Sequence, residues 1–228
     1  MATDPLRNLY YQLPAGFRNA ILVKRRSPLW LRAGIVFVHI PKAAGTSINH
    51  ALYGRFMGHP RACEIRKWGS RTLNALPSFA VTRNPWDRLV SAYRFVKRGR
   101  GIGGAYQAAI NHADQYSCPE FETFPLFVRE WLSVKDVSKL DGIFQPQSLF
   151  VCDRNGKILV DHVGSLDNLN STEEFIRSHL PSMPGIGFSN SSGDRVDYRA
   201  FYTGDLADIV ARVYADDIEL FGYRFDEA

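Results

Sequence analysis

The stretch Val36-Phe-Val-His-Ile-Pro-Lys-Ala-Ala-Gly-Thr-Ser47 decides the fold. Its apolar run breaks at a proline, and the residues after the break open an amphipathic segment. The pattern predicts a buried strand that passes through a short loop into a helix N-terminus, where unpaired N–H groups and the helix dipole attract anions. Lys42 adds a full positive charge, and Gly45 lets the backbone approach a ligand closely. Thr46 and Ser47 add hydroxyl donors, so the segment predicts an anion-binding loop.

This loop differs from the P-loop of nucleotide hydrolases. That motif is G-x-x-x-x-G-K-[ST], with the lysine after the second glycine. Here Lys42 precedes Gly45, and no glycine stands upstream at the required spacing. Taken alone, the segment is also compatible with an ordinary strand-to-helix turn that carries a solvated lysine.

A second segment, Phe79-Ala-Val-Thr-Arg-Asn-Pro-Trp-Asp-Arg-Leu-Val-Ser-Ala-Tyr93, repeats the layout of strand, polar break and helix. Asn84 is a suitable N-cap, and the proline after it suits the first helical turn. Arg83 ends the strand and Ser91 lies one to two turns into the helix, so both are expected to face one anion. Arg88 is expected to be solvated or paired with the neighbouring aspartate. The expected buried face of the helix comprises Leu89, Val90, Tyr93 and Val96.

Together the two segments resemble the carbohydrate sulfotransferases that use 3′-phosphoadenosine 5′-phosphosulfate (PAPS), the Golgi-type or family 2 enzymes and their bacterial relatives. Residues 144–148, 161–169 and 217–225 look like later landmarks of that family. The resemblance implies that Arg83 and Ser91 contact the 3′-phosphate. The residues it implies for the 5′-phosphosulfate are Lys42, Ala44, Gly45, Thr46 and Ser47. Many members carry threonine at the position of Ala44, a change expected to matter little because backbone N–H groups make most contacts there.

Sulfuryl transfer to a hydroxyl is expected to resemble phosphoryl transfer, which requires charge stabilisation at the leaving group and a base for the acceptor proton. The resemblance assigns the first role to Lys42. For the base we favour His59, which lies between the two anion loops in a Gly-His context like that of the family and titrates in a useful range. His39 is expected to pack beneath the site, and His50 to face either way. The histidines without a supporting motif are His112, His162 and His179.

Other site residues rest on weaker signals. Arg195 and Tyr198 are expected to close over the nucleotide from a late loop. Gln145 and Gln147 are candidates for the acceptor pocket, although a structural turn at the intervening proline explains them equally well. Histidines and carboxylates do not converge at ligand spacing, so no metal site is expected.

Composition supports a single α/β domain. The chain has 228 residues, 45% of them hydrophobic and 22% charged, which suits one globular core. Its net charge of +5 is uneven, because residues 1–110 hold 18 Lys and Arg against 3 Asp and Glu, whereas residues 111–228 hold 10 against 20. The basic half carries both anion loops and is expected to attract a polyanionic donor.

The alternation of strands and helices predicts a P-loop-like parallel β-sheet flanked by helices, with ligands at the carboxyl ends of the strands. We divide the chain into an irregular basic lead-in (1–33) and a sulfotransferase domain (34–228). The expected strands are 35–40 and 79–82, a hairpin joins 148–153 to 157–163, and 57–78 is a polar connection. The expected helices are 46–56, 86–98, 122–133, 204–219 and one opened by a capping box at Ser171.

Residues 1–34 show no secretory signal and no apolar run long enough to span a membrane, which favours a cytoplasmic protein. The basic N-terminal segment leaves peripheral membrane contact open. The widely spaced Cys63, Cys118 and Cys152 match neither a disulfide framework nor a zinc pattern, and are expected to be buried free thiols.

Two other functions remain open from the sequence. A nucleotide or small-molecule kinase requires a Walker-type loop and usually a carboxylate after a strand, where this chain has Arg83 and Asn84. A non-catalytic binder of nucleic acid or anionic glycan would suit the pI of about 9.2, but the acidic second half and the lack of an aromatic-basic platform disfavour it. For a sulfotransferase the acceptor would be a hydroxyl, with a glycan as the family default; lipid-linked sugars, peptides and small metabolites are not excluded.

Overall fold

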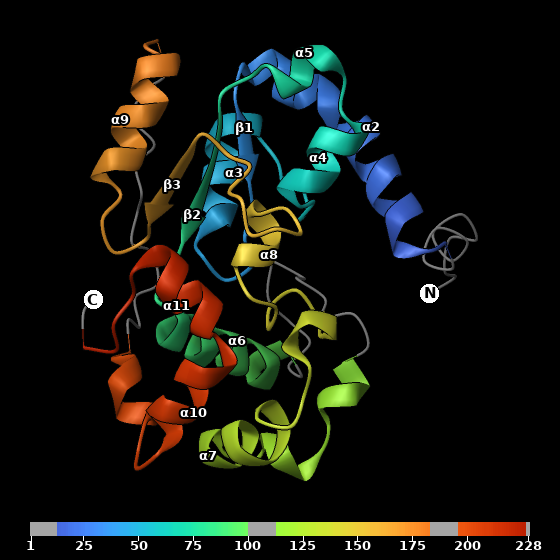
Figure 1. Cartoon of the computed structure of the whole chain (residues 1–228). Helices are drawn as coiled ribbons and strands as arrows, with labels where there is room; N and C mark the ends of the chain where they lie inside the picture. The colour runs from blue at the N-terminus through green and yellow to red at the C-terminus, as the bar shows by residue number, and fades with distance from the viewer. Residues whose placement is uncertain (1–12, 100–112, 183–195, 227–228) are drawn as a thin grey trace.

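The computed structural model describes residues 13–99, 113–182 and 196–226 (Figure 1). Arg195 lies outside these residues. In chain order the elements are α2 (Ala15–Ala33), β1 (Val36–Val38), α3 (Gly45–Tyr53), α4 (Ala62–Trp68), α5 (Arg71–Asn74), β2 (Ser78–Thr82), α6 (Pro85–Gly99), η1 (Ala113–Tyr116), η2 (Pro119–Phe121), α7 (Phe124–Leu126), η3 (Phe127–Leu132), η4 (Val137–Lys139), α8 (Ser148–Val151), β3 (His162–Ser165), α9 (Asn170–His179), η5 (Tyr198–Phe201), α10 (Leu206–Val213) and α11 (Ala215–Phe221).

The three strands form one parallel sheet in the order β1-β2-β3. Phe37 pairs with Phe79 across the first ladder, and Ala80 with Val163 across the second. Figure 1 shows α9 beside β3, the helices α2, α4 and α5 near β1, and α6 beyond the end of β2. This arrangement confirms the predicted single-domain α/β fold with a parallel sheet between helices, and β1 is a continuous apolar run as expected for a doubly covered strand.

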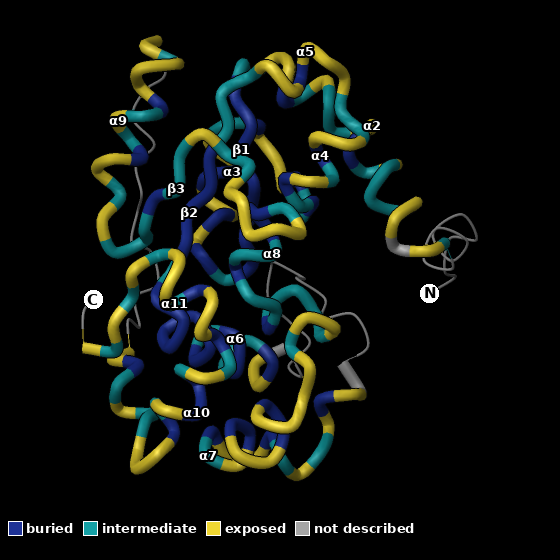
Figure 2. Tube along the Cα trace, viewed as in Figure 1, coloured by how far each residue is buried: buried dark blue, intermediate teal, exposed yellow. Residues whose placement is uncertain are grey.

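The interior contains two apolar clusters. One surrounds the sheet and includes residues of α2, α3, α4 and α8, while the other is rich in aromatic residues and joins α6 to η2, η3 and α10. Figure 2 shows β1, most of β2 and much of α6 as buried and β3 as mostly intermediate, with exposure concentrated on the outer turns of helices such as α9. The loop after β1 and the loop after β2 lie at the junction of the two clusters, which is where the predicted site residues gather.

The irregular lead-in expected for residues 1–33 is wrong over the described part, because α2 covers Ala15–Ala33. Val23 and Trp30 are fully buried and lie seven residues apart, on one face of this helix. Pro28 lies inside the helix, and the Ser27 hydroxyl donates to the Val23 carbonyl over 2.8 Å one turn earlier. The basic residues between the buried positions concealed this period in the sequence.

Several other expectations need correction. The connection 57–78 contains the two short helices α4 and α5, and the expected last helix is broken at Tyr214 into α10 and α11. The first arm of the expected hairpin is the helix α8, although Gly156, at φ +80°, does form the predicted tight turn. Across that turn Cys152 pairs antiparallel with Ile158, and the Leu159 N–H donates to the Val151 carbonyl over 2.8 Å, so the predicted hairpin forms over these few residues. Beyond it, β3 pairs in parallel with β2. The helix α9 begins at Asn170, so the capping box expected at Ser171 does not form.

The helix predicted over 122–133 is present, as α7 followed by the π-helical segment η3. The predicted face of α6 is buried as well, with Leu89, Val90, Tyr93 and Val96 all in the second cluster. The Trp86 N–H donates to the Asn84 side-chain oxygen over 3.1 Å, as expected for an N-cap. All three cysteines are free, but only Cys152 is buried and Cys63 is exposed, so the expectation of three buried thiols was wrong.

The outer edge of β1 is closed by a side chain rather than by a fourth strand. The Tyr53 hydroxyl accepts the Phe37 N–H over 2.8 Å and donates to the Ile35 carbonyl over 3.1 Å. These backbone groups are on the side of β1 that faces away from β2. Tyr53 thereby satisfies edge groups that burial would otherwise leave unpaired, and it ties the end of α3 to the strand that precedes the anion loop.

We predict that Tyr53→Phe lowers the free energy of unfolding by about 2 kcal/mol, because the Phe37 N–H then lacks a partner in a buried place. Urea unfolding measures the change as a lower midpoint with an unchanged slope. Tyr214→Phe is the matched control, since its buried hydroxyl makes a single bond, to the Phe144 carbonyl over 2.8 Å, and its loss should be about 1 kcal/mol. An unchanged midpoint for Tyr53→Phe would show that the strand edge does not need the hydroxyl.

Candidate active site

The loop after β1 has the geometry of an anion cradle. Lys42 (φ 68°) and Ala44 (φ 56°) both occupy the left-handed region, a conformation that costs a residue other than glycine about 1–3 kcal/mol. The two inversions turn the chain so that α3 starts at Gly45, leaving Thr46 and Ser47 exposed in its first turn. The predicted strand, loop and helix N-terminus are therefore present.

The glycine of this loop is required by close packing. A Cβ atom at Gly45 would lie 2.0 Å from Cδ2 and 2.4 Å from Nε2 of His39. The His39 ring is buried directly beneath the loop, as expected, and its Nδ1 lies 2.8 Å from the amide nitrogen of Asn49 on α3. Burial, followed by the nearby His59 and Lys42, lowers the pKa of His39 well below its usual range, so this ring is neutral.

The geometry of His59 suits a general base. Its Nδ1 lies 2.9 Å from the backbone carbonyl oxygen of His39, and a carbonyl only accepts, so Nδ1 carries the proton and Nε2 keeps its lone pair. Burial lowers the pKa of His59 to about 4, so the ring is neutral at pH 7. Phe56, which is 42% exposed, packs edge-on at 5.2 Å between ring centroids. The ring is thus held in the tautomer that accepts a proton at Nε2.

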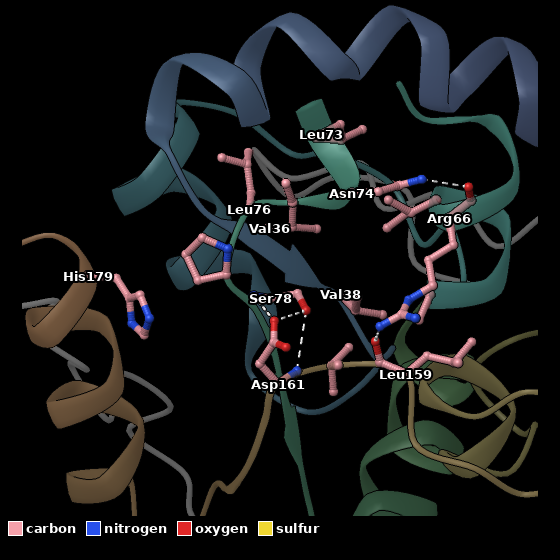
Figure 3. A pocket seen from close by; sticks show the side chains of 15 residues that line it. Val36, Val38, Arg66, Leu73, Asn74, Leu76, Ser78, Leu159, Asp161 and His179 are labelled. Carbon is pink, nitrogen blue, oxygen red and sulfur yellow. Dashed lines mark hydrogen bonds between the residues drawn. The ribbon is translucent and has the colours of Figure 1, made fainter. Parts of the chain in front are cut away.

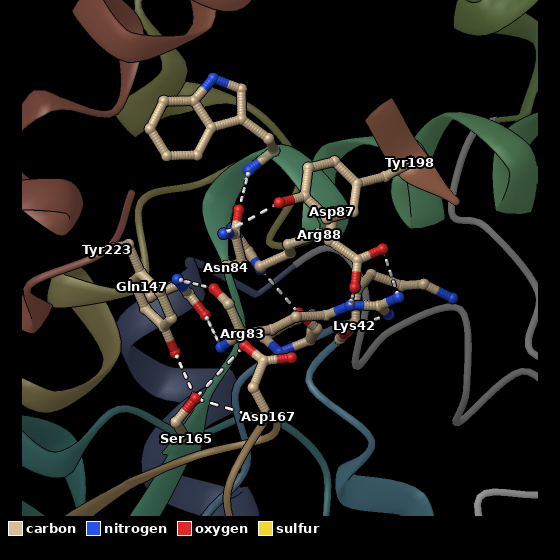
Figure 4. Close-up of polar contacts among 12 residues, drawn as sticks. Lys42, Arg83, Asn84, Asp87, Arg88, Gln147, Ser165, Asp167, Tyr198 and Tyr223 are labelled. Atoms are coloured by element: carbon tan, nitrogen blue, oxygen red, sulfur yellow. Dashed lines mark hydrogen bonds and ion pairs between the residues drawn. The ribbon is translucent and has the colours of Figure 1, made fainter. Parts of the chain in front are cut away.

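Arg83 connects the two predicted anion loops. Its Nε and Nη2 each lie 2.7 Å from an oxygen of Asp87, and its Nη1 donates to the Lys42 carbonyl over 3.1 Å (Figure 4). The guanidinium group has five N–H donors, and these contacts use three of them. Arg83 thus forms an ion pair with Asp87 at the end of β2. This pair orients the guanidinium group toward the loop after β1 and leaves two of its N–H groups for a further anion.

Arg88 was expected to be solvated or paired with Asp87, and this was wrong. Its side chain is buried and donates to three backbone carbonyls: Pro41 over 2.9 Å, Gly142 over 3.0 Å and Gln145 over 2.8 Å. The sequence held a signal for this burial, because Arg88 stands four and eight residues before the buried Ala92 and Val96 on α6.

Positive charge is in excess around the loop. The Lys42 ammonium lies 4.2 Å from the centroid of the Phe95 ring. Burial, followed by repulsion from Arg83, Arg88 and Arg98, lowers the pKa of Lys42 to about 8. Asp87 pairs with Arg83, and the buried Asp217 acts electrostatically on Arg88, so two carboxyl groups offset part of this charge. A bound anion would relieve this repulsion, so the site favours a polyanionic ligand.

The two glutamines expected in the acceptor pocket make hydrogen bonds to the protein framework. Gln147 is fully buried; its side-chain oxygen accepts the Arg83 N–H over 2.9 Å, and its side-chain nitrogen donates to the Arg83 carbonyl over 2.8 Å. Gln145 donates to the Leu140 carbonyl over 2.7 Å and accepts from Arg61 over 2.9 Å. Gln147 therefore fixes the end of β2, which agrees with the structural alternative for this residue, while Gln145 is only half-buried.

Tyr198 is buried in the second cluster. Its hydroxyl donates to the Phe225 carbonyl and lies 3.4 Å from the side-chain nitrogen of Asn84, which in turn donates to the Arg224 carbonyl over 2.9 Å. Ser91 is half-buried on α6. Residues 224 and 225 lie in one of the family landmarks, but the sequence did not indicate their contacts with Asn84 and Tyr198.

A separate hollow of about 470 Å³ lies at the amino ends of the strands, away from the anion loops (Figure 3). Its polar side chains are engaged with the protein: Arg66 donates to the Leu159 carbonyl, and Asp161 accepts from the Ser78 hydroxyl and N–H. None of the predicted site residues lines it. Within the described ranges no group of three or more His, Cys, Asp or Glu side chains could hold a metal ion.

Surplus positive charge around a strained loop at a helix N-terminus marks an α/β protein that handles an anionic group. The family model of the sulfotransferase family matches residues 32–224, so the chain belongs to this family. No significant match was found among curated proteins or among solved structures. The membership confirms the predicted resemblance and identifies the chain as a sulfotransferase, an enzyme of sulfuryl transfer.

We predict that Gly45→Ala lowers the affinity for 3′-phosphoadenosine 5′-phosphate (PAP) at least 10-fold, because the new methyl group must displace the buried His39 ring or the loop. Isothermal titration measures the change. Gly16→Ala is the matched control, since nothing lies within 4 Å of a Cβ atom there, and it should bind PAP normally. Equal affinity of both variants would mean that the loop does not contact the nucleotide.

Proposed function

We propose that this sulfotransferase moves a sulfuryl group from PAPS to a hydroxyl of an acceptor, with a glycan as the acceptor class. The observation that carries the proposal is the surplus of cations at the junction of the two loops. Burial, followed by repulsion from the neighbouring arginines, lowers the pKa of Lys42 to about 8. PAPS bears anionic groups at both ends of the adenosine, and two adjacent cationic loops suit such a donor.

We assign the loop after β1 to the 5′ end of the donor. The first-turn N–H groups of α3 and the exposed hydroxyls of Thr46 and Ser47 offer several donors to one phosphosulfate group. The backbone of Ala44 and Gly45 leads directly into this turn. The left-handed conformation at Ala44 needs no particular side chain, which agrees with alanine at a position where many family members carry threonine.

We assign Arg83 and Ser91 to the 3′-phosphate. Arg83 has two N–H donors left after its bonds to Asp87 and Lys42, and its pairing with Asp87 limits its rotation. Ser91 lies on α6, about one turn after Asp87. Tyr198 would contribute indirectly, because its hydroxyl holds Asn84 at the start of α6. Arg195, which lies outside the described residues, remains a proposed contact of the nucleotide.

In the proposed reaction the acceptor oxygen forms a bond to sulfur while the bond between sulfur and the bridging oxygen breaks. Lys42 stabilises the negative charge that develops on the leaving phosphate, an effect of about 3–4 kcal/mol in comparable sites. His59 accepts the acceptor's proton at Nε2, the nitrogen left free by the bond from Nδ1 to the His39 carbonyl. The exposed ring of Phe56 beside His59 supports a sugar acceptor, since sugar C–H faces stack on aromatic rings.

We predict that PAP raises the unfolding temperature more than ATP with magnesium does. With PAPS as donor, the enzyme should sulfate members of a glycan panel, and mass spectrometry detects the products.

Arg83→Gln should weaken PAP binding about 10- to 100-fold while leaving the binding of adenosine 5′-phosphosulfate, which lacks the 3′-phosphate, nearly unaffected. Arg212→Gln, an exposed change on α10, controls for the loss of charge. Stabilisation by ATP with magnesium alone would favour a kinase, and heparin or DNA binding with a steep salt dependence, without PAP binding, would favour a polyanion binder.

We predict a bell-shaped pH profile of kcat/KM, which reports the free enzyme. As pH falls through about 4, His59 gains a proton and can no longer act as a base; as pH rises through about 8, Lys42 loses the charge that stabilises the leaving group. Lys42→Arg should move the alkaline limb to higher pH, because a guanidinium group stays charged there. His59→Ala should lose 10²- to 10⁴-fold in rate together with the acid limb. An alkaline limb unmoved by Lys42→Arg would assign it to another group.

A further inference from the structure

The outer face of α2 is unusual for a surface helix. Phe17 is 65% exposed, Ile21 38% and Leu31 39%, and these residues lie four and ten residues apart along the helix. Pro28 is exposed between them. Ile21 lies about one turn and Leu31, fourteen residues on, about four turns after Phe17, so these side chains lie on one side, opposite the buried Val23 and Trp30. The helix thus has an apolar stripe toward solvent as well as one toward the core.

Basic side chains accompany this exposed stripe. Lys24, Arg25 and Arg32 are exposed on the same side. The sequence of α2 contains no aspartate or glutamate, and Arg18 and Arg26 bring the basic residues of the helix to five. The face therefore combines exposed apolar groups with the exposed basic side chains of Lys24, Arg25 and Arg32, and α2 itself supplies no acidic side chain to offset them.

We infer that this outer face of α2 binds an anionic lipid surface, with the helix lying in the plane of the interface. Positive charge alone would suit any polyanion, but Ile21, Pro28 and Leu31 offer neither hydrogen bonds nor aromatic stacking to a glycan or a nucleic acid. Basic residues beside exposed aliphatic and aromatic groups match the anionic head groups and the acyl region of a leaflet. No helix among the described residues is long and apolar enough to cross a membrane. The contact inferred for α2 is peripheral.

The inner face of the same helix supports the segment that carries His59. A Cβ atom at Gly58 would lie 2.8 Å from Leu22 of α2, and the Asn19 side chain donates to Glu64 of α4 over 2.5 Å. Because an α-helix with its side chains is only about 10–12 Å across, docking through the outer face would hold the His59 segment close to the lipid surface. The contact would thus set the location of the site, in addition to its chemistry.

Sedimentation of the full chain with vesicles tests the inference. We expect binding to phosphatidylcholine vesicles that contain phosphatidylserine, weaker binding as salt is raised, and little binding to phosphatidylcholine alone. Lys24→Gln with Arg25→Gln should lower the partition coefficient about 30-fold. Arg154→Gln with Lys157→Gln removes the same charge from the exposed turn after α8 and should leave binding unchanged.

The apolar part is tested separately. Phe17→Ser with Ile21→Ser should lower the partition coefficient at least about 10-fold, whereas Val134→Ser, at a residue 70% exposed elsewhere, should have no effect. Unfolding temperatures of all variants should match the parent, since the substituted side chains are exposed. Equal losses in the control variants, or binding to heparin that needs Lys24 and Arg25 without binding to vesicles, would overturn the inference. The readout does not involve PAPS, so it stands or falls independently of the proposed reaction.

Discussion

The candidate site depends on one buried guanidinium group. Arg88 donates to the Pro41 carbonyl in the anion loop and to the Gly142 and Gln145 carbonyls in the segment before α8. These three carbonyls belong to two segments about a hundred residues apart in the sequence, and α6 supplies the cation that joins them. A lysine has a single nitrogen and lacks the planar fork that reaches all three positions at once. The strained loop after β1 is thereby anchored from below at the residue that precedes Lys42.

The same anchoring creates the charge imbalance that the site uses. Arg88 is buried beside the loop, Arg83 reaches the Lys42 carbonyl, and together with burial they lower the pKa of Lys42. Left-handed residues in the loop add strain to this repulsion. Without an anion these terms oppose folding, and the surrounding packing and hydrogen bonds must offset them. A bound polyanion would turn this repulsion between cations into attraction to the ligand. The same arrangement that destabilises the empty site would therefore stabilise the occupied site.

Sequence patterns predicted the parts of the site that depend on local chemistry. The loop before α3, the strand-end Arg83 and the buried face of α6 follow from motif and period alone. What they missed depends on tertiary contacts. The short apolar run at α8 has no period that separates strand from helix, and the charges of α2 concealed the spacing of Val23 and Trp30. Gln147 looked like a polar pocket residue, but its complete burial against the Arg83 backbone depends on where α8 packs.

The two histidines near the loop show how position decides chemical role. His39 and His59 are both neutral, and their ring centroids lie 4.3 Å apart. Only the His59 ring bonds to a backbone carbonyl, which cannot donate and therefore fixes the proton on Nδ1. His39 supplies that group through its backbone, while its ring occupies the space that a side chain at residue 45 would need. One residue thus supports both the anion loop and the proposed base, His59. Because His39 belongs to the segment that leaves β1, this support depends on the strand end that Arg88 and Tyr53 hold in place.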